Sequence, residues 1–324
     1  MKRLPCVMLA LVSSSLTATV LADPLPSWNE GDNKSAIMDF VEATTDPASD
    51  DFVPQQQRIA VFDNDGTLWS EQPMYFQLSY ALQRASEADE EALDTPVKKA
   101  AAEGDLKTVM EAGNEGLLEV VSISHSGISV DDFQDDVRDW LASATHPNTD
   151  RFYTDMVFQP MLELLSYLRD EGYQTYIVSG GGVDFMRAFA SEAYGVPPEN
   201  IIGSIGDTEV VDNDGELELI KQPGVTFIDD GNGKPLAIQR HIGQRPTIAV
   251  GNSDGDVPML RYTTEADGPR LGVLLHHTDG EREYAYDRDS SFGRLDQGLE
   301  QAETDDWTVI DMAQDWRTVY QEAP

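Results

Sequence analysis

Residues 59–69 read Ile59-Ala60-Val61-Phe62-Asp63-Asn64-Asp65-Gly66-Thr67-Leu68-Trp69, the most informative segment of the chain. The first four are a continuous apolar run between polar neighbours, which is typical of a strand buried on both faces in a parallel sheet. Asp63, Asn64 and Gly66 are also turn formers, so a hairpin turn is the alternative interpretation. Because they directly follow an apolar run, we favour a loop at the carboxyl end of a central strand.

Four more apolar runs occur later in the chain, and segments with helical periodicity lie before and between the runs. The runs predict strands at residues 176–178, 247–250, 271–275 and 307–310. The periodic segments predict helices at residues 35–44, 160–171 and 183–193. Residues 212–215 indicate a hairpin turn. Alternation of strands and helices predicts an α/β fold with a doubly wound, mainly parallel, Rossmann-like sheet.

Residues 74–145 have helical spacing and no convincing strand. Tyr75, Leu78 and Leu82 share one face, and Ser129 with Asp132 has the pattern of a helix start. We therefore expect a helical insert at 74–145, between two parts of an α/β core at 23–73 and 146–324.

The first 22 residues have the features of a secretory signal peptide. Lys2 and Arg3 form a basic head, an apolar run covers residues 7–21, and Ala22 suits the cleavage position. We expect cleavage after Ala22 and a periplasmic or secreted mature protein. An uncleaved membrane anchor is the alternative, but the run is short and contains serines, so no membrane insertion is expected after cleavage.

Acidic residues dominate the composition. The 324 residues include 59 Asp and Glu against 22 Lys and Arg, a formal net charge of −37, and loss of Lys2 and Arg3 would make it −39. Such a surface repels nucleic acid and anionic membranes. It also suits high salt, where screening removes self-repulsion, so the protein could be halophilic. Cys6, the single cysteine, precedes the cleavage position, which excludes disulfides and thiol catalysis in the mature protein.

Polar segments follow three of the predicted strands. They are Asp63 to Trp69, then Ser179-Gly180-Gly181-Gly182, then Gly251-Asn252-Ser253-Asp254-Gly255-Asp256. Ligands of such sheets bind beyond the carboxyl ends of the strands, so we expect the three segments to form one site.

The two acids of the first segment have a specific chemical meaning. Asp63 and Asp65 would repel each other, and a divalent cation with oxygen ligands would remove that cost while offsetting the charge of a phosphate monoester. Asp63 could then attack phosphorus as a nucleophile. Asp65 could protonate the leaving oxygen and later deprotonate the attacking water. Gly66 would let the backbone approach the phosphate.

The run Phe62-Asp63-Asn64-Asp65-Gly66-Thr67-Leu68 resembles the first signature of the haloacid dehalogenase-like superfamily. The resemblance implies an aspartyl-phosphate on Asp63 and an acid/base role for Asp65. It implies phosphoryl binding by Ser179 with Gly180, and by Lys234, with Lys221 as the rival lysine. Chain order and the helical insert look most like the phosphoserine phosphatase-type branch, in which an insert at this point forms a cap.

Gly251 to Asp256 resembles the acidic fourth signature, with one departure. The family usually places an Asp directly after the glycine as a metal ligand, and here that residue is Asn252. An Asn carbonyl can bind a hard cation but supplies no charge. We expect Asp63, Asp65, Asn252 and Asp256 around one Mg²⁺, with Asp254 as the alternative third ligand and Asp256 binding through water or orienting Lys234.

Other residues are weaker candidates. Glu71 or Gln72 could face the leaving group, and the cap could contribute Arg84, Lys98 or Lys99. Arg187 could reach a substrate anion. His276 and His277 have no partner spacing for a metal, so a structural role is favoured. Residues 212–215 mimic a calcium loop, but the glycine comes too early.

The leading hypothesis is an exported, metal-dependent phosphatase of small phosphorylated metabolites. A phosphotransferase or phosphomutase is the closest alternative, and a non-catalytic binding protein on the same fold is the second. Asp65 argues against dehalogenation, which needs no acid for the leaving halide. The natural substrate and the oligomeric state are left open by the sequence.

Overall fold

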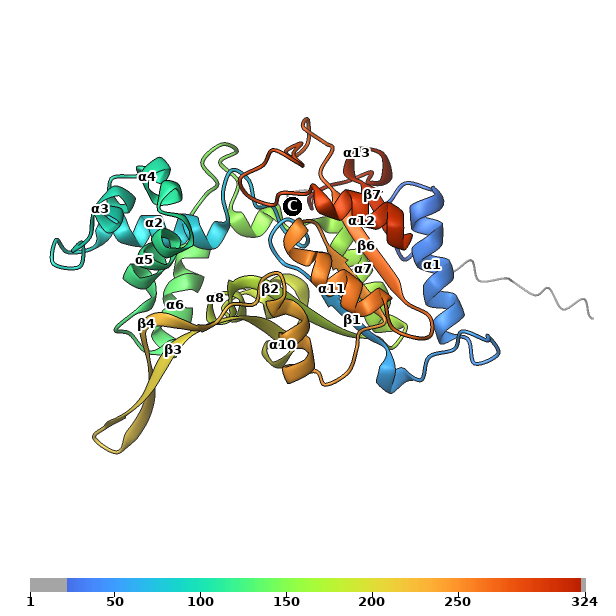
Figure 1. Ribbon diagram of the computed structural model, residues 1–324, viewed down its shortest axis with the longest axis horizontal. Helices are drawn as coiled ribbons and strands as arrows, with labels where there is room; N and C mark the ends of the chain where they lie inside the picture. Colours follow the sequence, from blue (N-terminus) through green and yellow to red (C-terminus); the bar gives the residue numbers. More distant parts are fainter. Residues whose placement is uncertain (1–21, 322–324) are drawn as a thin grey trace, which may run out of the picture.

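The computed structural model describes residues 22–321, so the predicted signal peptide lies almost wholly outside the described part. A seven-stranded sheet with the order β4-β3-β2-β1-β5-β6-β7 forms the centre of the molecule (Figure 1). Neighbouring strands are parallel except β3 and β4, which are antiparallel. The predicted doubly wound α/β fold is therefore confirmed.

The strands lie close to their predicted positions where a prediction was made. They are β1 (Ile59–Phe62), β2 (Gln174–Gly182), β3 (Ile201–Asn213), β4 (Glu216–Phe227), β5 (Ile248–Gly251), β6 (Leu271–His276) and β7 (Thr308–Asp311).

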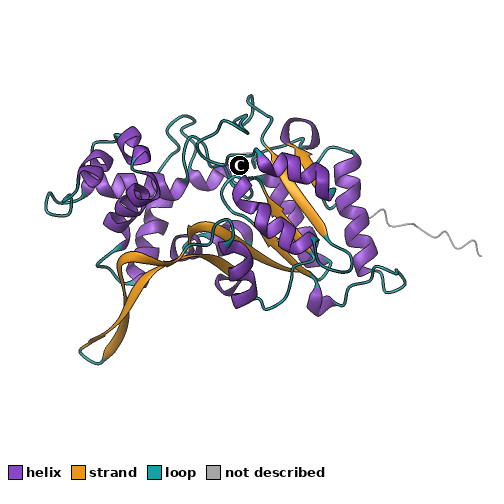
Figure 2. Ribbon diagram, in the orientation of Figure 1, coloured by secondary structure: helices purple, strands orange, loops and turns teal. Residues whose placement is uncertain are grey.

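Helices cover both faces of the sheet and form a further group beside it (Figure 2). They are α1 (Asp32–Thr45), α2 (Phe76–Glu87), α3 (Pro96–Ala102), α4 (Leu106–Glu111), α5 (Gly113–His125), α6 (Val130–Leu141), α7 (Gln159–Asp170), α8 (Val183–Arg187), α9 (Ala190–Tyr194), α10 (Gly233–His241), α11 (Val257–Thr264), α12 (Gln297–Asp305) and α13 (Met312–Asp315). Within residues 22–321, none of these helices has the length and apolar character that a membrane span requires.

The position of β1 between the two covered faces of the sheet explains why its residues are all apolar. Ala60 and Phe62 belong to the hydrophobic cluster that includes residues of α1 and α7, whereas Ile59 and Val61 belong to the cluster on α10, α11 and α12. All four side chains are buried because side chains of a strand alternate between the two covered faces.

Helices α2 to α6 occupy residues 76–141, where the sequence analysis expected a helical insert. Their own small cluster includes Leu78, Val109 and Val120. Ser129 caps α6, since its side chain accepts a hydrogen bond from the Asp132 amide at 3.0 Å. The group lies beyond the carboxyl end of β1, so it stands over the edge of the sheet where a ligand would bind (Figure 1).

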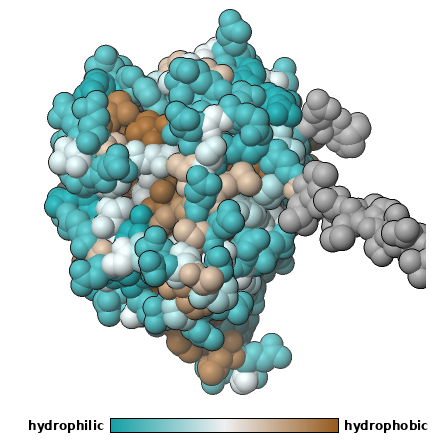
Figure 3. Space-filling model, turned by 90° about the vertical axis from the view of Figure 1, so that its right-hand side faces the viewer, coloured by the Kyte–Doolittle hydropathy of each residue, from teal (hydrophilic) through white to brown (hydrophobic). Residues whose placement is uncertain are grey.

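Strands β3 and β4 continue past the sheet as a long antiparallel arm that projects from the molecule (Figure 1). The predicted hairpin turn at residues 212–215 forms its tip, between two strands that the sequence analysis did not predict. Val210, Leu217 and Leu219 are exposed near the tip. Hydrophilic side chains cover most of the face in Figure 3, and apolar ones form patches at its upper left, near its centre and at its lower end.

The helix predicted at residues 183–193 is two helices, α8 and α9. Phe189 leaves helical geometry between them, with φ of −132°, and its ring stacks on Trp69 at 4.4 Å. This packing against the loop after β1 competes with the continuous helix that local periodicity favours.

Candidate active site

The loop that follows β1 turns back on itself and holds two carboxyl groups at the sheet edge. The Gly66 amide donates to the Trp69 carbonyl at 2.9 Å, and Gly66 has φ of 74°. A Cβ atom at Gly66 would lie 2.1 Å from Asn252 Nδ2 and 2.2 Å from Glu71 Oε1. Only glycine combines this left-handed conformation with such close neighbours, so the turn brings Asp63 and Asp65 toward the end of β5.

Side chains around the loop hold Asp65 and Asn64 in place. Trp69 Nε1 donates to Asp65 Oδ1 at 2.8 Å. The hydroxyl of Tyr194 donates to Asn64 Oδ1 at 3.0 Å, which anchors the loop to α9. Asp65 thus keeps its second carboxyl oxygen for other partners.

Ser179 ends the regular part of β2, and the glycines after it form a narrow loop. The Ser179 Oγ accepts a hydrogen bond from the Gly181 amide at 3.1 Å, and Ser204 Oγ donates to the Gly180 carbonyl at 2.8 Å. The β2–β3 register shifts between Ser179 and Gly182, so the backbone here leaves the ladder and faces the cavity.

Lys234 joins the ends of three strands. Its Nζ lies 2.6 Å from Asp63 Oδ1, 2.7 Å from Asp256 Oδ1 and 2.9 Å from the Val178 carbonyl. Helix α10 can begin this close because its first residue is Gly233, where a Cβ would meet the Ile228 carbonyl at 2.2 Å. Lys234 is 2% exposed, so its ammonium is a buried cation shared by two carboxylates.

Asp256 and Asn252, both in the loop after β5, contact different parts of the site. Asp256 Oδ2 accepts hydrogen bonds from the amides of Asn252 and Ser253, each at 3.0 Å, while Oδ1 faces Lys234. Asn252 Oδ1 accepts from Thr67 Oγ1 at 2.9 Å, and Asn252 Nδ2 donates to Glu71 Oε1 at 2.7 Å. Asp256 therefore orients the lysine, and Asn252 faces the first loop.

The site holds more negative than positive charge, and the pKa values of its acids reflect this. Burial and then Asp256 raise the pKa of Asp63 well above its usual value, although Lys234 lowers it. Burial raises the pKa of Asp65, which the hydrogen bond from Trp69 partly opposes. Burial raises the pKa of Glu71 well above its usual value, and Asp65 and Asp63 add to the increase against the bond from Tyr286.

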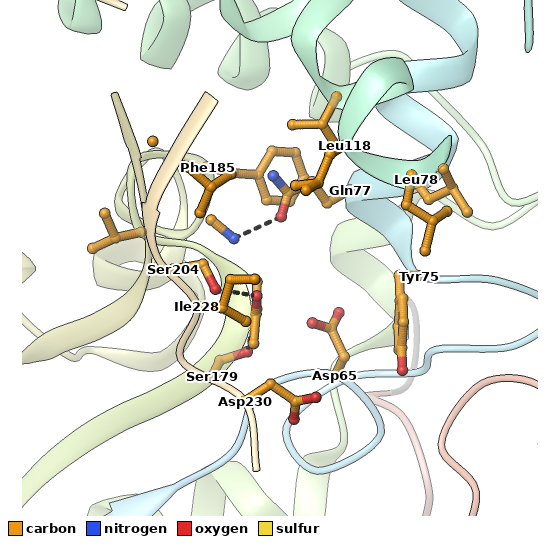
Figure 4. Close-up of a pocket in the computed structure, with 18 of the residues that line it drawn as sticks. Asp65, Tyr75, Gln77, Leu78, Leu118, Ser179, Phe185, Ser204, Ile228 and Asp230 are labelled. Atoms are coloured by element: carbon orange, nitrogen blue, oxygen red, sulfur yellow. Dashed lines mark hydrogen bonds between the residues drawn. The ribbon is translucent and has the colours of Figure 1, made fainter. Parts of the chain in front are cut away.

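Of these groups, the carboxyl groups of Asp63, Asp65 and Glu71 and the ammonium of Lys234 line one cavity of about 470 Å³, and Asn252 and Asp256 are not among its lining residues. Asp63, Asp65, Ser179 and Lys234 form its core end. Figure 4 shows Asp65 and Ser179 facing a hollow that Tyr75, Leu78 and Leu118 border from the helical group. Ile228, which follows β4, lies on the opposite wall. A small substrate would thus have its reacting end on the sheet and the rest between the helices and the arm.

A family model for haloacid dehalogenase-like hydrolases matches residues 60–261, which include the loop after β1, the glycine loop and Lys234. The chain belongs to the haloacid dehalogenase-like hydrolase family. A search of curated proteins finds no match.

Solved structures with similar folds include two proteins of unknown function. One, from Anaerococcus prevotii, has a TM-score of 0.55 at 18% identity, over 79% of this chain and 88% of that one. Another, from Bordetella pertussis, has a TM-score of 0.50 at 16% identity, over 79% and 99%. A haloacid dehalogenase family hydrolase from Salmonella enterica serovar Typhi has a TM-score of 0.42 at 14% identity, over 82% and 71%. At these identities the likeness shows the fold alone.

Several residues that the sequence suggested for this haloacid dehalogenase-like site lie elsewhere. Asp254 Oδ1 accepts hydrogen bonds from the amides of Asp296 and Gly298 at the start of α12, both at 2.9 Å. Gln72 donates to the Phe292 carbonyl at 2.9 Å and is not among the residues that line the cavity. Within the described chain, the same holds for the basic candidates, Arg84, Lys98, Lys99 and Arg187.

These basic side chains have other partners. Arg84 forms ion pairs with Glu87 and Asp136, and Lys98 pairs with Asp94 at 2.8 Å. Lys221 lines the cavity, but its ammonium pairs with Asp184. Lys234 is accordingly the lysine that contacts the predicted nucleophile.

The two adjacent histidines lie at the carboxyl end of β6, with His276 as its last residue and His277 directly after it. His277 Nε2 forms a hydrogen bond with the Gly66 carbonyl at 2.7 Å, and its Nδ1 lies 3.2 Å from Glu283. His276 lies 3.4 Å from Asp287. His277 thus supports the backbone of the loop that carries Asp63 and Asp65.

Sequence reasoning did not single out Gln77. Its Oε1 accepts from the Gly182 amide at 2.8 Å, and its Nε2 lies 3.0 Å from His125 Nε2. Figure 4 shows the bond to the glycine loop. Gln77 thus connects the helical group to the glycine loop. The sequence signal for a site role of Gln77 was its position in the first turn of the helix that follows the first loop. That signal was too weak to support a prediction.

Proposed function

We propose that this chain is an exported, metal-dependent phosphatase that hydrolyses small phosphomonoesters through an aspartyl-phosphate on Asp63. The observation that carries the proposal is that Asp63, Asp65, Ser179 and Lys234 line one cavity, with Lys234 Nζ 2.6 Å from Asp63 Oδ1. A nucleophile, an acid, a hydroxyl and a cation are the groups that phosphoryl transfer through a carboxylate requires.

In the first step, a carboxylate oxygen of Asp63 forms a bond to phosphorus as the bond to the ester oxygen breaks. Asp65 gives its proton to that leaving oxygen, and the raised pKa of Asp65 favours the protonated form it needs. Ser179 and Lys234 bind the phosphoryl oxygens, and the Gly180 amide lies beside them. In the second step Asp65 takes a proton from water, whose oxygen attacks phosphorus and breaks the bond to Asp63.

The acids of the site are of the kind that bind a hard divalent cation. Asp63, Asp65 and Glu71 are carboxyl groups with raised pKa values beside one cavity, and Lys234 is the cation that contacts the first of them. Asp63, Asp65 and the Asn252 carbonyl would hold Mg²⁺, with Asp256 set back against Lys234. When bound, Mg²⁺ would supply charge neutralisation for the phosphoryl oxygens.

Export supports hydrolysis over transfer to a metabolite acceptor. The basic head and apolar run at residues 1–22 favour a periplasmic or secreted location, with a mature chain that begins at Asp23. N-terminal sequencing of protein recovered from the periplasm or the medium tests this. A chain that still begins at Met1 would contradict the predicted export.

Hydrolysis of 4-nitrophenyl phosphate, with Mg²⁺ and with a chelator, tests the phosphatase. We expect activity with Mg²⁺, loss of at least about 10³-fold in Asp63→Asn, because removal of a nucleophile costs this much or more, and loss in the chelator. Asp51→Asn, a change in an exposed loop, is the matched control and should retain wild-type activity. Unchanged turnover in Asp63→Asn would refute the aspartyl-phosphate mechanism.

Product analysis separates hydrolysis from transfer. With an added alcohol acceptor, we expect inorganic phosphate as the main product. Phosphorylated alcohol as the main product would instead identify a phosphotransferase.

A further inference from the structure

The half of the cavity that faces the helical group is mainly apolar. Its apolar lining comes from the helical group, from α8, from the loop before α12 and from the arm with the residue after β4. It comprises Leu78, Met110, Leu117, Leu118, Val121, Val183, Phe185, Val225, Ile228 and Phe292. Tyr75 packs edge-on against Phe292, with ring centroids 4.9 Å apart. This half offers dispersion contacts and desolvation to whatever part of the substrate enters it.

Among the described residues that line the cavity, the basic ones are Lys234, Lys221 and His125, and none is an arginine. Lys234 contacts Asp63 and Asp256 at the core end. Lys221 pairs with half-buried Asp184 and lies over the ring of Phe133, 4.8 Å from its centroid. Burial lowers the pKa of His125 to about 3, so its ring is neutral at ordinary pH. A second anion in this half would therefore lose its hydration without gaining a free cation.

We propose, on the basis of the proposed function, that the preferred substrates are phosphomonoesters whose alcohol part is largely apolar and carries no second anionic group. Phosphorylated amino acids, phosphorylated hydroxy acids and nucleoside polyphosphates are then poor substrates, because each places another anion against apolar side chains.

A pair of aryl phosphates tests this with little change in size: 4-methylphenyl phosphate and 4-carboxyphenyl phosphate. We expect kcat/KM for the methyl compound to be at least about tenfold higher, since an unpaired charged group in a desolvated site costs this much or more. The carboxylate makes the phenol a slightly better leaving group, so intrinsic reactivity opposes the expected preference. Equal values, or faster hydrolysis of the carboxylate, would overturn the inference. No hydrolysis of either ester would refute the proposed phosphatase itself.

A substitution in α5 tests whether the cavity wall sets the preference for the methyl ester over the carboxyl ester. Leu118→Arg places a cation at a partly exposed position on the cavity wall and should reduce the ratio by at least about threefold through an added charge pair. Leu217→Arg, at the exposed tip of the arm, should leave the ratio unchanged. A ratio that responds equally to both changes would show that overall charge, and not the cavity wall, sets selectivity.

A second observation concerns the residue at the departure from the family pattern. Asn252 is neutral, but its Nδ2 donates to Glu71 Oε1 at 2.7 Å, directly beside Gly66 of the first loop. Glu71 is 1% exposed and lines the cavity together with Asp63 and Asp65. A carboxyl group is thus present within one hydrogen bond of the position where the family usually has an aspartate.

The contacts of Glu71 within the described chain are with neutral donors. Oε1 accepts from Tyr286 at 2.8 Å as well as from Asn252. Gly293 makes room for it, because a Cβ there would lie 1.8 Å from the same oxygen. A carboxyl group buried beside two others without its own ion pair is costly unless a cation approaches.

We infer that Glu71 supplies the negative charge that Asn252 lacks, and so raises the affinity of the proposed site for a divalent cation. Glu71 acts as a positioning and charge-supplying group next to Asn252. The inference rests on the proposed metal dependence and assigns no chemical step to Glu71.

Exchanging the charge between the two positions tests the inference. Glu71→Gln keeps the oxygen that accepts both hydrogen bonds and removes only the charge, so Mg²⁺ affinity, measured by calorimetry, should fall about 10–100-fold. Adding Asn252→Asp to that variant should restore the affinity to within about threefold. Glu163→Gln is the matched control, because Glu163 on α7 also accepts hydrogen bonds from neutral donors, away from the cavity.

The unfolding midpoint of each variant in chelator shows whether the fold is retained. Unchanged Mg²⁺ affinity in Glu71→Gln would overturn the inference, as would a double variant that binds as weakly as the single one. Full phosphatase activity of the wild-type protein in chelator would instead remove the proposed cation, and this inference with it.

Discussion

Replacement of Lys234 by methionine removes a buried cation on which two carboxylates depend. Lys234 Nζ lies 2.6 Å from Asp63 and 2.7 Å from Asp256, and all three side chains are at most 9% exposed. Methionine fills a similar volume, so the change acts mainly on charge.

The expected loss in stability follows from burial. Removal of one partner of a buried ion pair costs about 3–5 kcal/mol, because the remaining charge has neither water nor a counter-ion. At about 2–3 °C for each kcal/mol in a chain of this size, the midpoint of thermal unfolding should fall by about 6–15 °C.

The loss should also depend on pH. Burial and Asp256 raise the pKa of Asp63 in the folded state, and Lys234 opposes this increase. Without the lysine, the folded protein holds the Asp63 proton more firmly still, while the unfolded chain releases it at the usual carboxyl pKa. The variant and the wild type therefore both lose stability as the pH rises above about 4, and the deficit of the variant relative to the wild type grows once the pH passes the raised pKa of Asp63 in the wild-type protein.

Urea unfolding in chelator, followed by tryptophan fluorescence at several values between about pH 4 and about pH 8, measures this deficit. Lys34→Met is the control: Lys34 is as buried, but its partners Asp23 and Glu30 are 39% and 82% exposed, so a loss below about 1 kcal/mol is expected. A deficit in Lys234→Met as small as that of the control, or one independent of pH, would refute the reasoning.

Three further predictions concern residues around the site. Asp229 is fully buried, and burial raises its pKa to about 7. The folded wild type therefore loses stability as the pH rises from about 4 to about 7. In urea unfolding, Asp229→Asn should raise the free energy of unfolding by up to about 4 kcal/mol at pH 8 and leave it unchanged at pH 3. Arg84→Gln should change kcat/KM by less than about twofold, because Arg84 pairs with acids outside the cavity and such pairs contribute little. Ser129→Ala should cost about 1 kcal/mol in thermal unfolding through loss of the α6 cap, without changing KM.

The core of the candidate site could be predicted because its signals are local. An apolar run followed at once by Asp63 and Asp65 indicates a strand end, and parallel strands bring their carboxyl ends to one edge. The glycine loop with Ser179 follows from the same argument. These three residues share one cavity in the structure.

Residues far apart in sequence were harder to place. Glu71 and Gln72 are adjacent and looked equivalent, yet Glu71 faces Asn252 and Gln72 faces the loop at Phe292. Asp254 was the alternative to Asn252 as a metal ligand, but it binds the start of α12. Such choices depend on contacts across more than 40 positions, which periodicity does not report.

The order of buried runs and helical segments was sufficient for the α/β class, because both faces of a parallel sheet must be covered and such strands are apolar throughout. Charge was equally readable, since it depends on composition alone. Tertiary packing decided which acid faces which partner, where α8 ends, and that the arm of β3 and β4 forms a wall of the cavity. Those outcomes depend on long-range contacts, whose free energies outweigh the local preferences that a sequence displays.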